Sequence, residues 1–462
     1  MKNRIKQYLL VASMCVGLTA CSDFFEPIPG VQFGLDETFA SKQRTEEYLN
    51  NVYSYVREVT DAIHPNTYGG IFTEASLDGA NRWNKTYAEW TNGSFNSASA
   101  QASEYFSKYY QAIAKASTFI QNVDKCTEAA ASTRGKWKSE ARALRAYYYF
   151  ELLRLYGPIP LIGEDPIPLD ASLEELIKER NSVDECVNFI ATELQSAIDS
   201  GDLLQRAGKA NLGRMDVATC MALKAKLYLY WASPLFNGNT DQASVKNKDG
   251  KQLFPQTEDN SKWAQARDAY ERFMTFATGQ GYKLTEVYTN GKLDPYASCR
   301  AAGEFFTTTW EAVDELIFVK LRDLYDYTYW VCPKFTDFQD TDVTGGGGYY
   351  TTQETVDLFF TKDGLTIEED PGYDKFEGIP GANNFTSGRY YDPNNPSRLY
   401  FDADKSKVLK QWKDREPRFY VNITYSGSIW LNEGKYNEEM RTDFTNCLLY
   451  TSPSPRDRQK SR

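Results

Sequence analysis

Helical periodicity dominates the chain up to about residue 284, and its clearest example is RGKWKSEARALRAYYYFELLRLYGPIPLI, residues 134–162. Apolar residues recur there every three or four positions, as on one face of an α-helix. Gly157 followed by Pro158 predicts the end of this helix. The tyrosine run 147–149 alone favours a strand, but the surrounding period predicts a helix. The expected apolar face comprises Ala141, Leu144, Tyr148, Leu152 and Leu155, with Glu140, Arg142, Glu151 and Arg154 elsewhere.

Other segments with the same period flank this one, and they follow one another as pairs that can pack antiparallel. Ala and Tyr occupy their packing positions, and each pair needs its neighbours to bury its apolar face. We therefore expect a mainly α fold, a tetratricopeptide-like array of helical pairs, although the strict tetratricopeptide signature is absent. The predicted helical segments are 38–60, 103–126, 171–200, 213–236 and 261–279.

The chain divides by composition into the array, residues 39–284, and a loop-rich, partly irregular region, residues 285–446. Within the array, residues 66–98 form an excursion rich in Gly, Asn and Trp. Long irregular segments in compact proteins usually carry function, so we expect ligand binding to involve the loops. Four glycines at 345–348 lack the Gly-Lys-Ser/Thr ending of a phosphate loop and indicate a flexible loop.

The N-terminus has the layout of a bacterial secretory signal. Residues 1–20 combine a basic head with an apolar stretch too short to span a bilayer. Leu18-Thr19-Ala20-Cys21 resembles a lipobox, in which the cysteine is lipidated and becomes the new N-terminus. We expect a signal peptide at 1–20, a lipid anchor at Cys21 and a tether at 21–38; the alternative is an ordinary signal peptide with an accidental cysteine.

Composition excludes several classes of protein. The net charge of −11 and a pI near 5.0 disfavour nucleic-acid binding. A single histidine, His64, leaves few ways to build a His-centred metal site or a Ser-His-Asp triad. No Cys-x-x-Cys pair is present, and the scattered cysteines are expected to be small buried residues. We predict no metal and no cofactor.

Two clusters of aromatic and polar residues are candidates for carbohydrate binding. Aromatic rings cover the CH faces of sugars, while Asn, Asp and Arg bind paired hydroxyls. The alternative is that several rings are core residues, and the alternating tyrosines at 325–329 would also suit one face of a strand. The predicted binding residues are Asp78, Asn81, Arg82, Trp83 and Trp90 in the excursion, and Tyr327, Tyr329 and Trp330 in the loop-rich region.

Two other classes of function stay open from the residues alone. A glycoside hydrolase needs two carboxylates at a defined separation, and a pair such as Glu74 and Asp78 can be imagined. The separation cannot be obtained from a sequence, so this indication is weak. A purely structural scaffold would use the helical array for protein contacts, and only the aromatic loops argue against it.

Four segments resemble, in order, the conserved blocks of the SusD/RagB family. The resemblance implies an outward-facing outer-membrane lipoprotein of Bacteroidota-type bacteria that binds oligosaccharides or other nutrients and is not an enzyme. It also implies a SusC-like TonB-dependent transporter as partner, and four tetratricopeptide-like helix pairs. The segments are SEARALRAYYYFELLRLYGPIPLI (139–162), GRMDVATCMALKAKLYLYWASPLFNG (213–238), TTQETVDLFFTKDG (351–364) and DREPRFYVNITYSGSIW (414–430).

The C-terminus departs from that family pattern. Relatives continue well beyond the Arg-Asp-Pro-Arg-Phe-like block, whereas this chain ends in CLLYTSPSPRDRQKSR, residues 447–462. The first part of this ending resembles a translated sequencing adapter. We therefore expect residues 447–462 to be a non-native tail; the alternative is a natural basic tail.

Overall fold

The computed structural model describes most of the chain between Phe33 and Ser428. The described residues are 33–56, 76, 79–81, 89, 93–163, 165, 167, 171–303, 314–320, 349–375, 381–404, 407–425 and 427–428.

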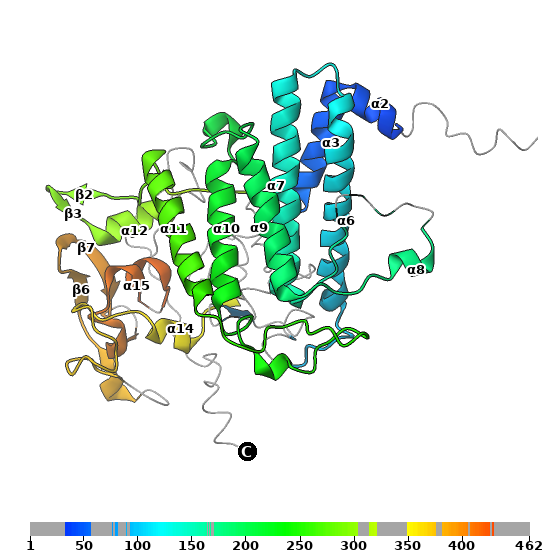
Figure 1. The fold of residues 1–462 in the computed structure, drawn as a ribbon. Coiled ribbons are helices and arrows are strands. Elements are labelled where there is room, and N and C mark those ends of the chain that lie inside the picture. The colour runs from blue at the N-terminus through cyan, green and yellow to red at the C-terminus, as the bar shows by residue number, and fades with distance from the viewer. Residues whose placement is uncertain are drawn as a thin grey trace, which may run out of the picture.

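The first part of the structure is a row of packed helices (Figure 1). Neighbours in the row are α3 and α6, α6 and α7, α7 and α9, α9 and α10, and α10 and α11. The fold is mainly α and tetratricopeptide-like, as predicted. Its helices are α2 (Leu35–Ala40), α3 (Lys42–Ser54), α6 (Ala100–Asn122), α7 (Ala131–Tyr156), α8 (Leu173–Leu176), α9 (Val183–Asp199), α10 (Val217–Ala232) and α11 (Ser261–Gly279).

The ends of these helices follow from local chemistry. Helix α7 stops at Gly157, whose φ of 69° is readily adopted only by a residue without a Cβ. Helix α9 begins with a capping box in which Ser182 and Glu185 each bond the other's backbone N–H. The Asp216 side chain accepts a hydrogen bond from the backbone N–H of Thr219 and so caps α10.

Helix α7 is the centre of the array and is buried on nearly all sides. This corrects the predicted division into an apolar and a charged face, since Glu140 and Glu151 are buried. The Arg145 guanidinium is also buried and donates from Nε to Glu193 Oε2 at 2.8 Å. A buried charge is tolerated when it is paired and hydrogen-bonded, so a polar residue on α7 does not indicate exposure.

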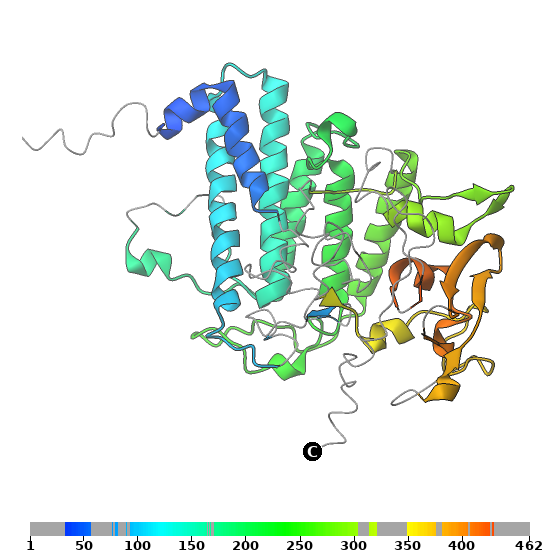
Figure 2. The same ribbon diagram turned by 180° about the vertical axis from the view of Figure 1, so that it is seen from behind.

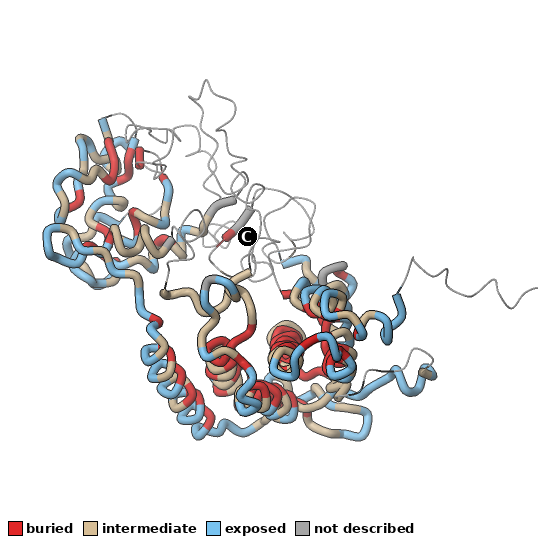
Figure 3. The backbone as a smooth tube through the Cα atoms, turned by 90° about the horizontal axis from the view of Figure 1, so that it is seen from above, coloured by how far each residue is buried: buried red, intermediate tan, exposed pale blue. Residues whose placement is uncertain are grey.

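Several boundaries differ from the sequence expectation, and the predicted helix over 38–60 is interrupted at Ser41, between α2 and α3. The predicted helix over 171–200 is two helices, α8 and α9, separated by an irregular segment that leads to the cap at Ser182. Helix α2 begins at Leu35, inside the segment expected to be a tether up to residue 38. Seen from above, buried residues run through the array, and the segment carrying α8 is largely exposed (Figure 3).

The second part contains short helices and two-stranded sheets. Strands β2 and β3, β5 and β8, and β6 and β7 pair antiparallel. The elements are β2 (Tyr288–Thr289), β3 (Lys292–Leu293), α12 (Pro295–Gly303), β4 (Tyr349–Tyr350), α14 (Gln353–Asp357), β5 (Phe385–Thr386), β6 (Arg389–Asp392), β7 (Asn395–Asp402), β8 (Val408–Leu409) and α15 (Pro417–Asn422). Short 3₁₀ helices lie at 123–125, 209–211, 240–242, 382–384 and 410–412.

A small aromatic core and two arginines hold this part together. Tyr400 and Tyr420 stack with their ring centroids 3.9 Å apart. Arg398 bonds both oxygens of Asp294 at 2.9 Å and Asp392 at 2.7 Å, which ties the β2–β3 hairpin to β6–β7. Buried Arg415 donates to the carbonyl of Phe359 at 2.8 Å, beyond α14.

Within the described ranges, no helix is both long and apolar enough to cross a membrane. In the same ranges, no group of three or more His, Cys, Asp or Glu side chains could hold a metal ion. Cys126, Cys186 and Cys220 are buried free thiols, as the scattered spacing predicted, whereas Cys299 is free but only half-buried and Cys332 lies outside the described residues.

Candidate functional site

Of the eight predicted binding residues, only Asn81 lies in the described part of the chain. It is the second residue of β1 (Ala80–Asn81). Cys21, the hydrolase candidates Glu74 and Asp78, and the other predicted binding residues lie outside the described residues. What the structure describes near the site is therefore the set of segments next to the two clusters.

The first flank is the pairing of β1 with β4. Ala80 pairs with Tyr350 and Asn81 with Tyr349, antiparallel (Figure 2). Strand β1 lies inside the first predicted cluster, and β4 directly follows the segment that contains the second cluster. A backbone ladder thus joins the interior of the first candidate segment to the end of the second, although the two are far apart in the sequence.

The second flank is Lys320, the last described residue before the segment that contains Tyr327 and Trp330. Its ammonium donates to the carbonyls of Ser54 and Val56 at 3.1 and 2.6 Å. These carbonyls follow the end of α3, where a cation is favourable because the helix dipole leaves the carbonyls partly negative. Val56 is the last described residue before the excursion, so both candidate loops also leave the array at one place.

A groove of about 300 Å³ lies at this junction, and we call it the junction groove. Its wall combines apolar side chains, one tyrosine and hydrogen-bonding groups. It is lined by Asn50, Tyr53, Ser54, Val56, Leu212, Gly213, Arg214, Phe318, Val319 and Lys320. A concave surface with few polar groups among apolar ones is typical of a small-molecule subsite.

A buried charge network fixes the polar wall of the junction groove. Arg214 donates to Glu140 at 3.1 Å and to Glu46 at 3.0 Å. The Tyr53 hydroxyl donates to Glu140 at 2.9 Å and accepts from the Met215 N–H at 2.8 Å. Arg214, Glu140 and the Tyr53 hydroxyl each hold two partners, so these three side chains have little freedom to rotate.

The same burial sets the protonation of the network. Desolvation raises the pKa of the Glu140 carboxyl, and Arg214, Tyr53 and Lys136 partly offset this rise. Desolvation and the neighbouring Glu140 charge raise the pKa of Tyr53 well above its ordinary value, so its hydroxyl keeps its proton near neutral pH. The network supplies fixed donors and acceptors, and its one fully buried carboxylate is already held by Arg214 and Tyr53.

Backbone packing positions the segment 314–320 against the array. Thr219, on the first turn of α10, donates to the carbonyl of Ile317 at 3.3 Å. Gly213 has a φ of 83°, and a Cβ there would lie 2.8 Å from the carbonyl oxygen of Val319. The close packing of Val319 against residue 213 therefore requires glycine at that position.

Sequence reasoning did not identify the residues of the junction groove. Arg214 lies in one of the quoted blocks, directly after Gly213, but Gly-Arg is not a binding signature. Lys320 ends the run LIFVK, which is equally typical of a buried strand with a charged end. Their shared role depends on contacts between segments more than 100 residues apart, which no local pattern shows.

Comparison with known proteins gives two matches to family models. Residues 32–229 match a model described as "Starch-binding associating with outer membrane", and residues 315–461 match the model of the SusD family. Together the two ranges cover well over half of the chain. The second range includes most of the predicted tail, and the non-native origin of that tail stays a prediction.

Individual relatives agree with the family models. A SusD-like protein of Bacteroides ovatus is 27% identical over 248 residues, which are 52% of this chain and 42% of that protein. The solved structure described as BT4246 superposes with a TM-score of 0.65 at 25% identity, covering 82% of this chain and 64% of that one. A SusD-like protein of Bacteroides fragilis, BF3747, shares the fold, with a TM-score of 0.58, 19% identity, and coverage of 84% and 62%.

This chain thus aligns with less than two thirds of the length of each of these relatives. The matched ranges include three of the four quoted blocks in full and residues 213–229 of the block at 213–238. The chain belongs to the SusD/RagB family.

Proposed function

We propose that this protein is a surface lipoprotein that captures oligosaccharides and delivers them to a SusC-like TonB-dependent transporter in the outer membrane. The single observation that carries the proposal, beyond the family, is that the two segments with the aromatic clusters are joined to each other or to a common helix end at two places. Lys320, before the second cluster, bonds the end of α3, and β1, inside the first cluster, pairs with β4 after the second. We infer that rings from both segments act on one ligand.

The chemistry of binding would follow from the predicted side chains. Trp83, Trp90 and Trp330 offer flat apolar surfaces, and Asp78, Asn81 and Arg82 offer planar polar groups for hydroxyls. The junction groove adds donors that are already fixed. A shallow, wet site buries little area, so we expect a Kd between micromolar and millimolar, about −8 to −4 kcal/mol. Retention of a polymer would then depend on several contacts.

Lipid attachment at Cys21 accounts for location at the membrane. Several acyl chains on one residue anchor a protein firmly, because each buried CH₂ contributes about 0.8 kcal/mol. Replacing Cys21 with alanine should move the protein from the membrane fraction to the soluble periplasm. A variant that remains in the membrane fraction would contradict the anchor.

The experiment that tests the function is a glycan-array screen of the protein from Ser22, followed by a reducing-sugar assay on every glycan that binds. We expect selective binding and no release of reducing ends. Release that is abolished by changing one carboxylate would favour the glycoside hydrolase instead. The screen should be run with the chain ending at residue 446 and with the chain ending at 462, because the tail is predicted to contribute nothing.

A further inference from the structure

One face of α3 is bordered by two hollows, one toward each end of the helix. Helix α3 lies against α6 and α7 at the edge of the array (Figure 2). The junction groove borders Asn50, Tyr53 and Ser54, in its last turns. A second hollow of about 460 Å³, which we call the α3 hollow, borders Lys42 and Glu46, in its first turns. Residues three or four positions apart share one face of a helix, so both hollows follow one stripe about 18 Å long.

Arg214 borders both hollows. Its guanidinium donates to Glu46, in the α3 hollow, at 3.0 Å, and to Glu140 at 3.1 Å. The Tyr53 hydroxyl, in the junction groove, donates to the same Glu140 carboxylate at 2.9 Å. The Arg214 guanidinium also lies over the Tyr53 ring, 5.3 Å from its centroid. One hydrogen-bonded network therefore fixes the adjoining sides of the two hollows, which are parts of a single surface.

The rest of the α3 hollow is formed by the start of α7 and by the segment that leads to α10. Lys136 Nζ on α7 donates to Asn211 Oδ1 at 3.2 Å, which joins the two. The Asp202 carboxylate packs directly on α7, since a Cβ at Gly135 would lie 2.7 Å from it. Three side chains of α7 complete the lining, namely Ser132, Thr133 and Trp137. The hollow is thus built by elements from three separate parts of the chain.

The charges around the α3 hollow are balanced. Three cationic and two acidic side chains line it. The buried Glu140 carboxylate adds a third acidic group, 3.8 Å from Lys136 Nζ and 3.1 Å from Arg214. Because cationic and acidic groups are equal in number, an anionic ligand gains no net attraction there. The hydroxyl, amide, carboxylate and ammonium groups of the lining are instead suited to the hydroxyls of an uncharged ligand.

The shape of this surface indicates a chain rather than a single small ring. It runs along α3 from Lys320, which precedes the second aromatic segment, to Lys42 at the start of the helix. We propose that one uncharged oligosaccharide chain lies along this face of α3, with one part in the junction groove and a further part in the α3 hollow. The inference rests on the proposed function and deepens it, because it names the class of glycan and adds a subsite on the helical array.

The test is the dependence of affinity on chain length, measured by isothermal titration calorimetry with the protein from Ser22. The probes are malto-, xylo- and manno-oligosaccharides of three and of eight sugar units, with oligogalacturonates of the same lengths as their anionic counterparts. We expect at least one neutral octamer to bind at least tenfold more tightly than its trimer, because the further contact is made by a chain that is already held. The galacturonates should show no such gain.

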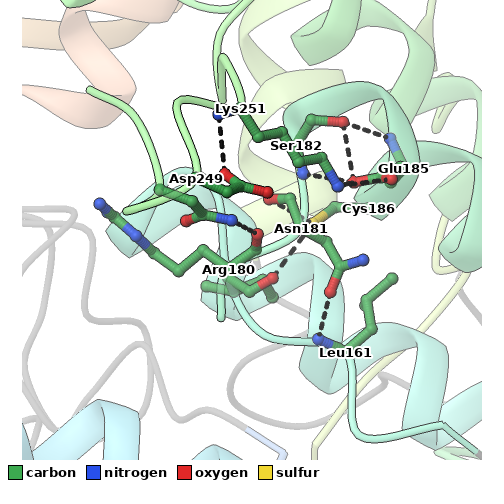
Figure 4. Close-up of polar contacts among 10 residues, drawn as sticks. Leu161, Arg180, Asn181, Ser182, Glu185, Cys186, Asp249 and Lys251 are labelled. Atoms are coloured by element: carbon green, nitrogen blue, oxygen red, sulfur yellow. Dashed lines mark hydrogen bonds and ion pairs between the residues drawn. The ribbon is translucent and has the colours of Figure 1, made fainter. Parts of the chain in front are cut away.

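Two pairs of variants assign the gain to the α3 hollow. Ser132→Trp fills the hollow and should reduce the gain to about twofold or less, with trimer affinity unchanged. Its control is Ser261→Trp, which changes an exposed serine in the first turn of α11 that borders neither hollow. Lys42→Ala removes one donor from the hollow and should reduce the gain severalfold. Its control is Lys251→Ala, which removes a lysine paired with Glu185 at the start of α9 (Figure 4).

An unchanged gain in Ser132→Trp, an equal loss in the control variants, a gain confined to the galacturonates, or no gain in any neutral series would each overturn the proposal. If Ser132→Trp melts at a lower temperature than Ser261→Trp, the lysine pair decides, and an unchanged gain in Lys42→Ala overturns it.

Failure of the proposed function is measured separately, with the trimers. If Trp83→Ala and Trp330→Ala leave trimer affinity unchanged while Ser132→Trp removes the octamer gain, the aromatic site is wrong and the subsite on α3 stands. If the two tryptophan variants lose the trimer and the wild type shows no gain with length, the aromatic site stands and the subsite on α3 is wrong.

Discussion

The helical array and the loop-rich region are stabilised in different ways. In the array, α7 is surrounded by α3, α6 and α9, and one continuous apolar core runs from Phe39 to Phe254. In the loop-rich region the core is small and consists mostly of tyrosine and phenylalanine, such as Tyr400, Phe401 and Phe419. A long helix can bury an apolar face along its whole length, whereas a two-stranded sheet cannot. The second region therefore depends on ring stacking and ion pairs.

Arginine shows the difference most clearly. Arg145 lies inside the array, where it pairs with Glu193 and Ser117. Arg398 and Arg415 instead join separate short elements to one another. The block DREPRF, which resembles the family pattern, therefore builds the scaffold of the second region and does not contact the junction groove. The family signal at DREPRF therefore indicates fold rather than ligand, whereas the block 213–238 contributes Gly213 and Arg214 to the junction groove.

The largest expected effect is the loss of Glu193. Glu193→Gln leaves the guanidinium of Arg145 buried with too few partners, and we expect the free energy of unfolding of the array to fall by about 3–5 kcal/mol. Urea unfolding followed by circular dichroism at the helical signal measures it. Glu185→Gln, which removes an exposed pair with Lys251, is the control and should cost about 1 kcal/mol or less. Equal losses in the two variants would contradict the buried-pair account.

The matching change in the loop-rich region is Arg398→Met. It leaves Asp294 and Asp392, both buried, without their shared cation, and we expect a loss of about 3 kcal/mol confined to this region. Hydrogen exchange should rise in β6 and β7 while α7 stays protected. The control is Arg418→Met, whose side chain is 58% exposed in its pair with Glu416. Loss of protection in α7 as well would show that the two regions unfold as one unit.

The array could be predicted because its determinants are local. The period of 134–162 and the glycine at 157 act within one or two turns, and α7 follows from them. The capping box at Ser182 is equally local, but the predicted helix over 171–200 runs through it. The part of the prediction that was wrong is the solvent exposure of the charged residues on α7. Glu140 and Glu151 have the spacing of a charged face, but both are buried, and they pair with Arg214 before α10 and with Arg154 of α7 itself.

The loop-rich region could be predicted only as irregular. Its strands are two to eight residues long and are fixed by pairings such as Arg389 with Asp402, which depend on turns rather than on a period. The candidate site was predicted by residue type, and the structure adds the flanks at Lys320 and β4. Those contacts join segments from distant parts of the chain and have no local signature.

A smaller effect is expected at the point where the two parts meet. Gly213→Ala introduces a Cβ 2.8 Å from the Val319 carbonyl oxygen, in addition to the strain of a positive φ. Gly250→Ala is the matched control, since its φ of 88° is similar and a Cβ there meets nothing within 4 Å. We expect about 1 kcal/mol of destabilisation at 250 and about 1–3 kcal/mol more at 213, by thermal unfolding. Identical losses would mean that segment 314–320 is not packed as described.

The smallest expected effect is the loss of stability at acid pH, to which one carboxylate from each region contributes. A hydrogen bond from Lys251 lowers the pKa of Glu185 from 4.5 to about 2, and one from Arg398 lowers that of Asp294 from 3.8 to about 2. The stability each ionised carboxylate contributes is complete above its ordinary pKa and is lost as the pH falls toward about 2. Glu185→Gln and Asp294→Asn should each flatten the decline in stability between about pH 4.5 and pH 2. An unchanged slope in both variants would contradict the assigned pairs.

The central proposal is that the two aromatic segments beside the junction groove bind glycan. Affinity gel electrophoresis tests this proposal directly, in a gel that contains the glycan identified by the glycan-array screen. Trp83→Ala and Trp330→Ala are compared with Trp263→Ala. Trp263 is 42% exposed on α11 and belongs to neither loop. We predict that each loop variant weakens retention by about tenfold, with unchanged helicity and melting, and that Trp263→Ala is retained like the wild type. Equal retention of all three variants, or unfolding of the loop variants, would contradict the account.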